Sequence, residues 1–301
     1  MDIRETLLAS GFAHVAVLDG RACGAGCHRL VLGFAGYEAP APSAHILEAV
    51  VHPYYPVSQA AYQRVRALER EWAAAGLRIR QAPEIHIKPV LNRLPFLRRG
   101  RNTLSYLPGV GSRFHVQILA CGEDLPITDP LQPAEHGVSC GSCRRCADAC
   151  PSGAIGESGF DREKCLRFWM MNGQVPPRAI AARMGNRLMG CDECERCCPM
   201  NRPGTGAPIT LPLRDVVTGQ ARDRLVPLLG SNYALKNRLV AQGCVMAGSL
   251  GRTDLAPEIR EIASGHPSPL CRQAAALAAQ IMTEAEGAPS GAPPAAEKLY
   301  V

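Results

Sequence analysis

Two dense cysteine runs constrain this chain more than any other feature of its sequence. Residues 140–151, CGSCRRCADACP, follow the spacing C-x2-C-x2-C-x3-C-P. Some forty residues later, 191–199 read CDECERCCP, which gives C-x2-C-x3-C-P with one additional cysteine, Cys197. Thiols gathered this closely bind metals, form disulfides or carry redox chemistry, so the fold must bring them together.

The spacing favours two 4Fe–4S clusters. Gaps of two residues suit three corners of one cubane, and in bacterial ferredoxin runs the cysteine before proline serves the other cluster. The proline then ends the local helix. We therefore predict the following ligands: Cys140, Cys143, Cys146 and Cys198 for the first cluster, and Cys150, Cys165, Cys191 and Cys194 for the second. Cys197 is interpreted as a spare thiol that could compete with Cys198.

Two other readings of the cysteines stay open. Pairs of the form C-x2-C also bind zinc, although zinc sites rarely use a three-cysteine run with an exchanged fourth ligand. Disulfides require an oxidising compartment. The stretch MDIRETLLASGFAHVAVL lacks a signal-peptide pattern, and no run of about 18 apolar residues predicts a membrane span. We therefore expect a cytoplasmic protein, free of the membrane, with reduced thiols.

Hydrophobic patterning before the cysteines predicts a mixed α/β domain over residues 1–125. Short apolar runs at 14–18, 29–34 and 112–123 are typical of strands. Residues 57–76 place apolar side chains at spacings of three and four, which predicts an amphipathic helix.

Downstream, we expect a ferredoxin-like double-cluster domain over 126–210 and helices alone over 211–284. Apolar stripes there, starting at Leu235 and Leu255, end in tight turns and resemble HEAT-like stacked repeats. The composition of 285–301 predicts a disordered tail. The fold class expected for the whole chain is α+β.

The formal net charge is +6. Each oxidised cubane with four thiolates adds −2, so a chain loaded with both clusters would carry about +2. Local basic patches say more about partners, because they fit phosphates of nucleic acid or of a cofactor tail, although each could equally be a solvated surface. They comprise Arg93, Arg98, Arg99 and Arg101, and farther on Arg222, Arg224, Lys236 and Arg238.

A smaller motif, CGAGCH at 23–28, is one residue longer than the haem-attachment motif. Cys23, Cys27 and His28 could form a metal site, but we favour two ordinary thiols.

Taken together, these motifs resemble the epoxyqueuosine reductases. The segments HGVSCGSCRRCADACPSGAI and MGNRLMGCDECERCCPMNRP look like that family's two cluster runs, and GRNTLSYLPGVGSRFHVQIL is similar to its strand region beside the corrin. The cluster motifs alone also occur in other cobalamin reductases, and the helical repeats narrow the choice.

The resemblance implies an oxidoreductase that passes electrons through two clusters to cobalamin and deoxygenates an epoxide on a modified tRNA base. It implies tRNA and an external electron donor such as a flavodoxin or ferredoxin as partners. We expect this protein to be a monomer. By the same resemblance, residues 1–125 would bind cobalamin, with Arg101, Asn102 and Ser105 beside it.

The chain departs from the family where an acid is expected. The family motif is Asp-Ser/Thr-Gly/Ala-Pro-Val-Leu, and here HIKPVL places His86 in the position of the aspartate that is proposed to donate a proton. An imidazolium can donate a proton near neutral pH, so His86 is the candidate acid. The alternative is that His86 has a structural role in a strand. The segments 20–45 and 89–100 are also shorter than expected.

Two other functions remain open at this point. One is a two-cluster electron-transfer or reductase protein without cobalamin, acting on another substrate or protein partner. The other is a non-catalytic RNA-binding module in which the clusters are structural.

Overall fold

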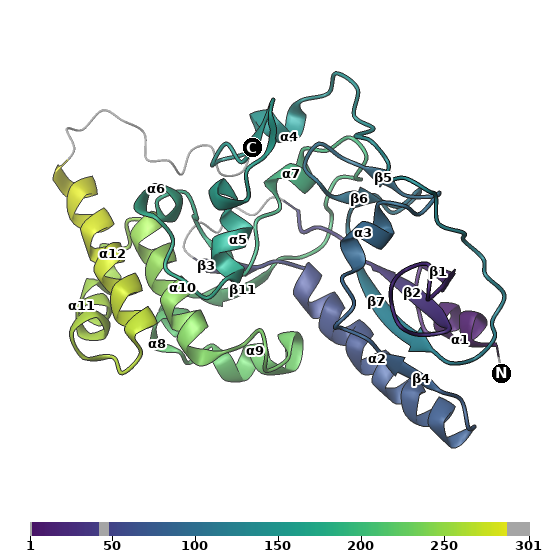
Figure 1. The fold of residues 1–301 in the computed structure, drawn as a ribbon. Helices are drawn as coiled ribbons and strands as arrows, with labels where there is room; N and C mark the ends of the chain where they lie inside the picture. The colour runs from purple at the N-terminus through teal and green to yellow at the C-terminus, as the bar shows by residue number, and fades with distance from the viewer. Residues whose placement is uncertain (1, 42–47, 288–301) are drawn as a thin grey trace. The chain divides into compact units, whose positions relative to one another are not determined.

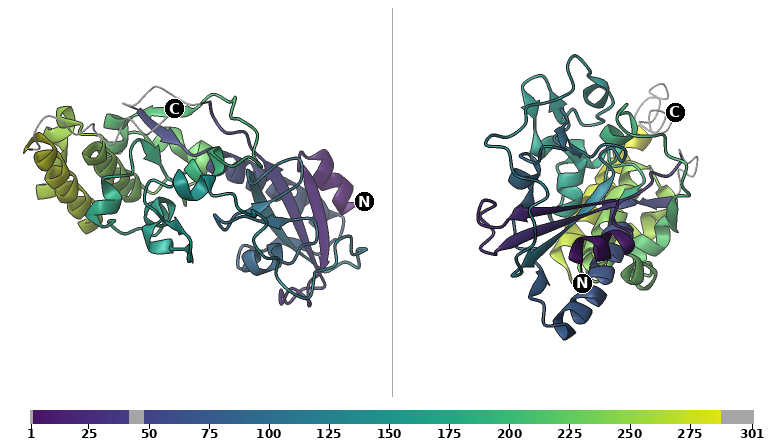
Figure 2. Two further views of the ribbon diagram at one scale, coloured as in Figure 1. Left: turned by 90° about the horizontal axis from the view of Figure 1, so that it is seen from above. Right: turned by 90° about the vertical axis from the view of Figure 1, so that its right-hand side faces the viewer.

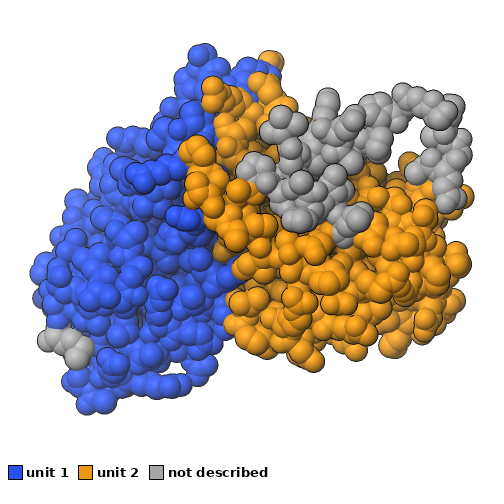
Figure 3. Space-filling view, turned by 180° about the vertical axis from the view of Figure 1, so that it is seen from behind, with its two compact units in different colours: residues 1–38, 54–144, 198–202 blue, residues 39–53, 145–197, 203–301 orange. Residues whose placement is uncertain are grey.

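The computed structural model describes residues 2–41 and 48–287. They form two compact units, each assembled from separate stretches of chain (Figure 3). Unit 1 comprises Met1–Glu38, Tyr54–Arg144 and Cys198–Arg202, and unit 2 comprises Ala39–Pro53, Arg145–Cys197 and Pro203–Val301. Among the described residues, none of the helices combines the length and apolar character that a membrane crossing needs.

Unit 1 is built on a four-stranded antiparallel sheet (Figure 1). In spatial order its strands are β1 (His14–Asp19), β2 (Arg29–Gly36), β7 (Phe114–Cys121) and β4 (Ile79–Gln81). The three strands that the apolar runs predict are present as β1, β2 and β7. Because every pairing is antiparallel, this unit is α+β rather than a parallel α/β domain.

Helices α1 (Ile3–Ala9) and α2 (Tyr54–Ala74) cover one face of the sheet (Figure 2). The apolar stripe of α2 buries Ala61, Val65 and Trp72 against the sheet, as the sequence periodicity predicts for 57–76. A fully buried Trp or Leu contributes about 1.5–3 kcal/mol through loss of apolar surface from water, so this face anchors the sheet.

The opposite face of the sheet carries a short helix and a small hairpin. Helix α3 (Ile87–Leu91) leads into β5 (Arg98–Arg99) and β6 (Ser105–Tyr106), which pair antiparallel. Leu94 and Leu97 fill the core beneath them. His86 is the exposed residue that precedes α3, so its expected position inside a strand is wrong.

Unit 2 holds the rest of the cysteine segment in short elements around a small sheet. That sheet has the order β10 (Arg187–Leu188), β3 (Glu48–Val51) and β11 (Ile209–Pro212), in which β3 runs parallel to β10 and antiparallel to β11. The remaining elements are α4 (Arg145–Asp148), β8 (Ile155–Gly156), β9 (Gly159–Phe160), η1 (Arg162–Lys164), α5 (Leu166–Met171), α6 (Arg178–Ala181) and α7 (Glu193–Arg196).

Five helices and one 3-10 turn complete unit 2 (Figures 1 and 2). They are α8 (Leu213–Thr218), α9 (Arg222–Leu229), α10 (Lys236–Ser249), η2 (Thr253–Leu255), α11 (Ala256–Gly265) and α12 (Pro269–Gly287). Helix α10 packs between α8 and α12, and α11 packs on α12. An all-helical segment is therefore present, while its assignment to HEAT-like repeats stays a prediction.

Two details of the helical prediction differ from the structure. Leu235 is 49% exposed at the N-cap of α10, because the helix begins one residue after it. Helix α12 continues to Gly287, past the predicted start of the tail at residue 285. The remainder of that predicted disordered tail, 288–301, lies outside the described residues.

Two glycines let α10 approach its neighbours closely. A Cβ on Gly243 would lie 2.9 Å from the Val217 nitrogen of α8, and a Cβ on Gly248 would lie 2.8 Å from the Ala278 Cα of α12. Contacts this short with backbone atoms require the helices to separate. The missing side chains therefore set the spacing of the three helices.

We expect Gly248→Ala to lower the free energy of unfolding by about 1–3 kcal/mol, because overpacking against α12 exceeds the roughly 1 kcal/mol gain in helix propensity. Gly265→Ala is the matched control, since no atom lies within 4 Å of its added methyl group. Urea unfolding of both variants, followed by circular dichroism, measures the difference. Equal stabilities would contradict the close packing of α10 on α12.

Candidate metal centre

The first cysteine run begins in a loop of unit 1 that Arg101 holds. The Arg101 backbone N–H donates to Cys140 Sγ at 3.2 Å, its Nε donates to the Cys143 carbonyl at 3.3 Å, and its Nη2 donates to the Gly141 carbonyl at 3.2 Å. The loop also closes on itself through Cys143 N and the Cys140 carbonyl, 3.0 Å apart. One residue therefore fixes both the first thiol and the backbone between two predicted ligands.

The run continues into unit 2 with the next two cysteines. Cys146 lies in α4 and is buried. Cys150 follows that helix, and the Ala154 N–H donates to its sulfur at 3.3 Å. A left-handed turn at Gly153 (φ 65°) brings this N–H back toward the sulfur. Backbone N–H groups aimed at cysteine sulfur are the contacts that stabilise and tune iron–sulfur clusters.

Three predicted ligands of the second cluster, Cys165, Cys191 and Cys194, lie near one another in unit 2, and each is partly exposed. Burial raises the pKa of the Cys191 thiol to about 12. Burial also raises the pKa of Cys194 well above its usual value, and the nearby thiols of Cys191 and Cys165 add to this effect. Thiolates are costly in such a place unless a bound cation compensates their charge. The donor set therefore fits a cluster whose iron supplies that positive charge.

Among the described residues, no three His, Cys, Asp or Glu side chains converge on a site for one metal ion. The ligands of a cubane each bind a different iron atom. The thiols of a cluster site are consequently not required to meet at a single point.

Cys198 lies at the start of the last stretch of unit 1, and Asn201 fixes that stretch. Asn201 Oδ1 accepts from the Ser112 N–H at 2.7 Å, and its Nδ2 donates to Ser112 Oγ at 2.9 Å. Arg113 adds a hydrogen bond from Nη1 to the Arg202 carbonyl, 2.6 Å away. A Cβ on Gly111 would lie 2.1 Å from Asn201 Oδ1, so only glycine fits there. No pattern in the sequence pointed to this role of Asn201.

Gln242 of α10 joins the two chain segments that carry the second set of cysteines. Its Oε1 accepts from the Met189 N–H at 3.0 Å, and its Nε2 donates to the Met170 carbonyl. Met189 is in the left-handed region (φ 70°) two residues before Cys191. Gln242 is itself buried. A polar residue on an otherwise apolar helix face was the available signal, which the sequence analysis did not use.

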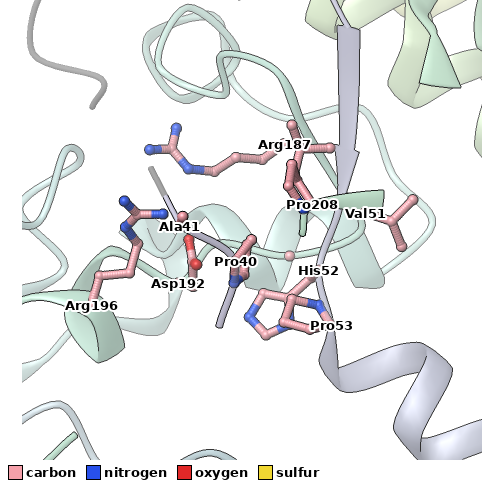
Figure 4. Close-up of a pocket in the computed structure, with 11 residues that line it drawn as sticks. Pro40, Ala41, Val51, His52, Pro53, Arg187, Asp192, Arg196 and Pro208 are labelled. Carbon is pink, nitrogen blue, oxygen red and sulfur yellow. The ribbon is translucent and has the colours of Figure 1, made fainter. Parts of the chain in front are cut away.

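A small pocket lies in unit 2 (Figure 4), and two of the residues that line it flank Cys191 in the sequence. Gly190 and Asp192, the two neighbours of that cysteine, line it together with His52, Arg187 and Arg196. Arg187 forms an ion pair with Glu193 of α7 and lowers the pKa of Cys191, against the larger effect of burial. A cationic side chain therefore lies near Cys191 and favours its thiolate form.

The hairpin formed by β5 and β6 holds the residues expected beside cobalamin. Asn102 is 4% exposed, and its Nδ2 donates to the Tyr106 hydroxyl at 2.9 Å. Its Oδ1 accepts from the Leu104 N–H at 3.3 Å. Thr103 adopts a left-handed conformation (φ 63°). Ser105 lies half-buried on β6. Strained turns of this kind gather at ligand-binding sites, so the turn fits a cofactor-binding role through its backbone.

The structure does not bring Cys23, Cys27 and His28 to one point. Burial raises the pKa of Cys23 to about 11, and Cys27 Sγ donates to the Arg29 carbonyl at 3.1 Å. His28 instead pairs with Asp124, its Nε2 lying 3.1 Å from a carboxylate oxygen. This arrangement agrees with two ordinary thiols.

Several arginines of the basic patches have partners of their own. Arg93 Nε donates to the Gln132 carbonyl at 2.8 Å, and Arg99 lies 3.6 Å from a Glu135 oxygen. Arg224 lies 3.8 Å from Asp215. Ion pairs this exposed contribute little energy, so these guanidinium groups can exchange partners with a phosphate.

Comparison with known proteins shows which domain family and which relatives this chain resembles. The family described as "4Fe-4S double cluster binding domain" matches residues 139–201, the stretch that contains all eight predicted ligands. An epoxyqueuosine reductase of Bacillus subtilis is 27% identical over 192 residues, which cover 59% of this chain and 48% of the relative. One of Burkholderia pseudomallei is 35% identical over 118 residues, covering 37% and 29%. The chain spans about half the length of the curated relatives it matches.

Solved structures show the same fold over nearly the whole chain. The structure of epoxyqueuosine reductase from Bacillus subtilis, with its catalytic loop swung out of the active site, has a TM-score of 0.70 at 17% identity, covering 98% of this chain and 91% of that one. A crystal structure of epoxyqueuosine reductase with an epoxyqueuosine-modified tRNA-Tyr stem loop has a TM-score of 0.70 at 17% identity, covering 98% and 95%. The cysteine runs, the relatives and the shared fold together make the chain similar to the epoxyqueuosine reductases, and residues 139–201 match the double-cluster family.

Proposed function

We propose that this protein is an iron–sulfur reductase that removes the epoxide oxygen from a modified base of tRNA, in the queuosine pathway. The observation that carries this proposal is the proximity of the Cys165, Cys191 and Cys194 thiols, within a segment that matches the double-cluster family. The relatives named epoxyqueuosine reductase and the neighbour with a tRNA stem loop support the substrate class.

Two 4Fe–4S clusters would supply one-electron transfer when bound. Cys140, Cys143, Cys146 and Cys198 are proposed to hold one, and Cys150, Cys165, Cys191 and Cys194 the other. Arg101 and Ala154 direct backbone N–H groups at the sulfurs of Cys140 and Cys150. Such bonds stabilise the more negative state of a cluster and so shift its potential upward.

Cobalamin is proposed as the second cofactor, and when bound it would supply the nucleophilic chemistry at the substrate. The turn between β5 and β6 is the proposed contact, with Arg101, Asn102 and Ser105 near it. Asn102 shapes this turn through its bonds to Leu104 and Tyr106. His86, the candidate acid that the sequence suggests, is exposed and precedes α3.

The proposed partners are tRNA and an external electron donor such as a flavodoxin or ferredoxin. The helices α8 to α12 are proposed as HEAT-like repeats that meet the tRNA backbone, with Arg222, Arg224, Lys236 and Arg238 supplying positive charge. We also propose a monomer in the cytoplasm, where cysteine ligands stay reduced.

A two-cluster electron-transfer protein without cobalamin is the second candidate. The observation that favours it is His86, which stands where the family's aspartate is expected. In the described residues no capping hydrogen bond from this side chain orients it at the start of α3.

The cluster ligands can be tested by iron content. We expect the reconstituted protein to hold about eight irons, and Cys165→Ser and Cys198→Ser to fall to about four each, because each loses one ligand of a different cubane. Cys197→Ser is the matched control and should keep about eight. Iron and sulfide assays with electron paramagnetic resonance measure the content. Loss of a cluster in Cys197→Ser alone would exchange the roles of Cys197 and Cys198.

The hydrogen bonds of Arg101 should affect one cluster more than the other. We expect Arg101→Gln to keep both clusters but to shift the potential of the first, because its side chain no longer holds the loop 140–143. Potentiometric titration with electron paramagnetic resonance measures both potentials. Arg98→Gln is the control, since within residues 2–41 and 48–287 its guanidinium donates only to the Pro95 and Leu97 carbonyls. Unchanged potentials in Arg101→Gln would remove this role.

The function itself is tested by anaerobic titration with cob(II)alamin, followed by an assay on an epoxyqueuosine-containing tRNA stem loop. Tight binding with a base-off absorbance spectrum and formation of queuosine are the expected results. A protein with about eight irons that neither binds cobalamin nor forms queuosine would instead be the two-cluster electron-transfer protein.

A further inference from the structure

Lys88 lies on α3 with its ammonium group directed at the turn between β5 and β6. Its Nζ lies 3.4 Å from Thr103 Oγ1. The residue as a whole is exposed, and across the described part of the chain no carboxylate forms an ion pair with it. A lysine on this surface without a counter-ion remains available to a ligand.

The partner of Lys88 sits in a fixed and strained position. Thr103 has φ 63°, a conformation that side-chain-bearing residues adopt rarely. Its N–H donates to the Gly100 carbonyl at 3.0 Å, and the buried Asn102 ties the same turn to Leu104 and Tyr106. A Cβ on Gly100 would lie 2.5 Å from Asn102 Oδ1, so the turn also requires glycine there. The surroundings therefore hold the hydroxyl that receives Lys88.

The environment of Lys88 makes its ammonium group more acidic than usual. Loss of hydration is the larger cause of its lowered pKa, and the positive charge of Arg99 adds to it. Arg99 lies on β5, across from α3, and is itself 3.6 Å from Glu135. His86, the N-cap residue of α3, is a further titratable residue two positions before Lys88.

Lysine is rare among the basic residues of this chain. Only four of its 33 basic residues are lysines, at positions 88, 164, 236 and 298. A guanidinium cannot release its proton near neutral pH, whereas an ammonium with lowered pKa can. Lys88 also occupies the position of Gly or Ala in the motif that HIKPVL resembles. The departure at His86 is thus accompanied by a second one that introduces a proton-releasing group.

We propose that Lys88, positioned by Thr103, is the residue that donates a proton to the leaving epoxide oxygen in this protein. The inference rests on the proposed function and replaces His86 as the acid. The overall change is balanced: two electrons from the external one-electron donor and two protons convert the epoxide into a carbon–carbon double bond and water. In the step assigned to Lys88, its N–H bond breaks, an O–H bond forms, and the neutral amine recovers its proton from solvent.

The activity test compares Lys88→Met, Lys88→Arg and His86→Gln in the complete protein with both clusters and cobalamin. We expect kcat on the modified stem loop to fall about 10²–10⁴-fold in both Lys88 variants, and to stay within about threefold of wild type in His86→Gln. Arg66→Met, which removes an exposed cation on α2, is the control and should keep full activity. Affinity for the stem loop should change less than about threefold in Lys88→Met.

The pH dependence of kcat tests whether Lys88 acts in its protonated form. Lys88 acts in its protonated form, so kcat should decrease as pH rises through its lowered pKa, below the usual lysine value of about 10.4. Arg99→Gln removes the neighbouring positive charge, which should raise the pKa of Lys88 and move this decrease to higher pH. Competitive acylation of the lysines across pH, read by mass spectrometry, measures the same pKa without substrate, with Lys236 as the reference amine.

Distinct results would overturn the proposal. Full activity in Lys88→Arg would mean that only its charge matters, as in phosphate binding, and loss of stem-loop affinity in Lys88→Met would mean the same. Full activity in Lys88→Met with loss in His86→Gln would return the role to His86. A wild-type protein that holds both cofactors and forms no queuosine would instead overturn the proposed function, and the proton-donor role with it.

Discussion

The free-energy cost of placing negative charge on the cysteine thiols is the constraint on which this structure depends. Burial raises the pKa of Cys191 and Cys194, so the negative charge that a metal ligand needs is costly until iron is bound. The protein offsets this cost with groups that favour charge on sulfur. Backbone N–H groups of Arg101 and Ala154 point at Cys140 and Cys150, and Arg187 lies near Cys191.

The rest of each unit holds these groups in place. In unit 2, α10 supplies Gln242, which bonds to the chain on either side of the second cysteine set, and the glycines of α10 let α8 and α12 pack closely around that helix. In unit 1, Asn201 joins the segment after Cys198 to Ser112 at the start of the strand region. The helices and the sheet thus hold in place the loops that carry the cysteines.

Sequence patterns succeeded where a local rule decides the outcome. Strands β1, β2 and β7 follow apolar runs, and α2 follows a stripe of period 3.6 that buries Ala61, Val65 and Trp72. They failed where the surroundings decide. Leu235 continues an apolar stripe but is exposed, because α10 begins just after it. Strand β3 exists through pairing with residues more than 130 positions away, which no local pattern records.

By itself, the sequence determined the chemistry of this protein, because ligand type and spacing are written in the cysteine runs and the family match covers the same residues. Only the tertiary structure decided which side chains serve that chemistry. The sequence placed Arg101 beside a cofactor, and the structure shows that its side chain donates hydrogen bonds to the loop 140–143. No sequence pattern pointed to Lys88, and its contact with Thr103 exists only because the fold places α3 beside the turn between β5 and β6. Acidity and hydrogen bonding depend on neighbours in space, and the order of residues along the chain does not specify them.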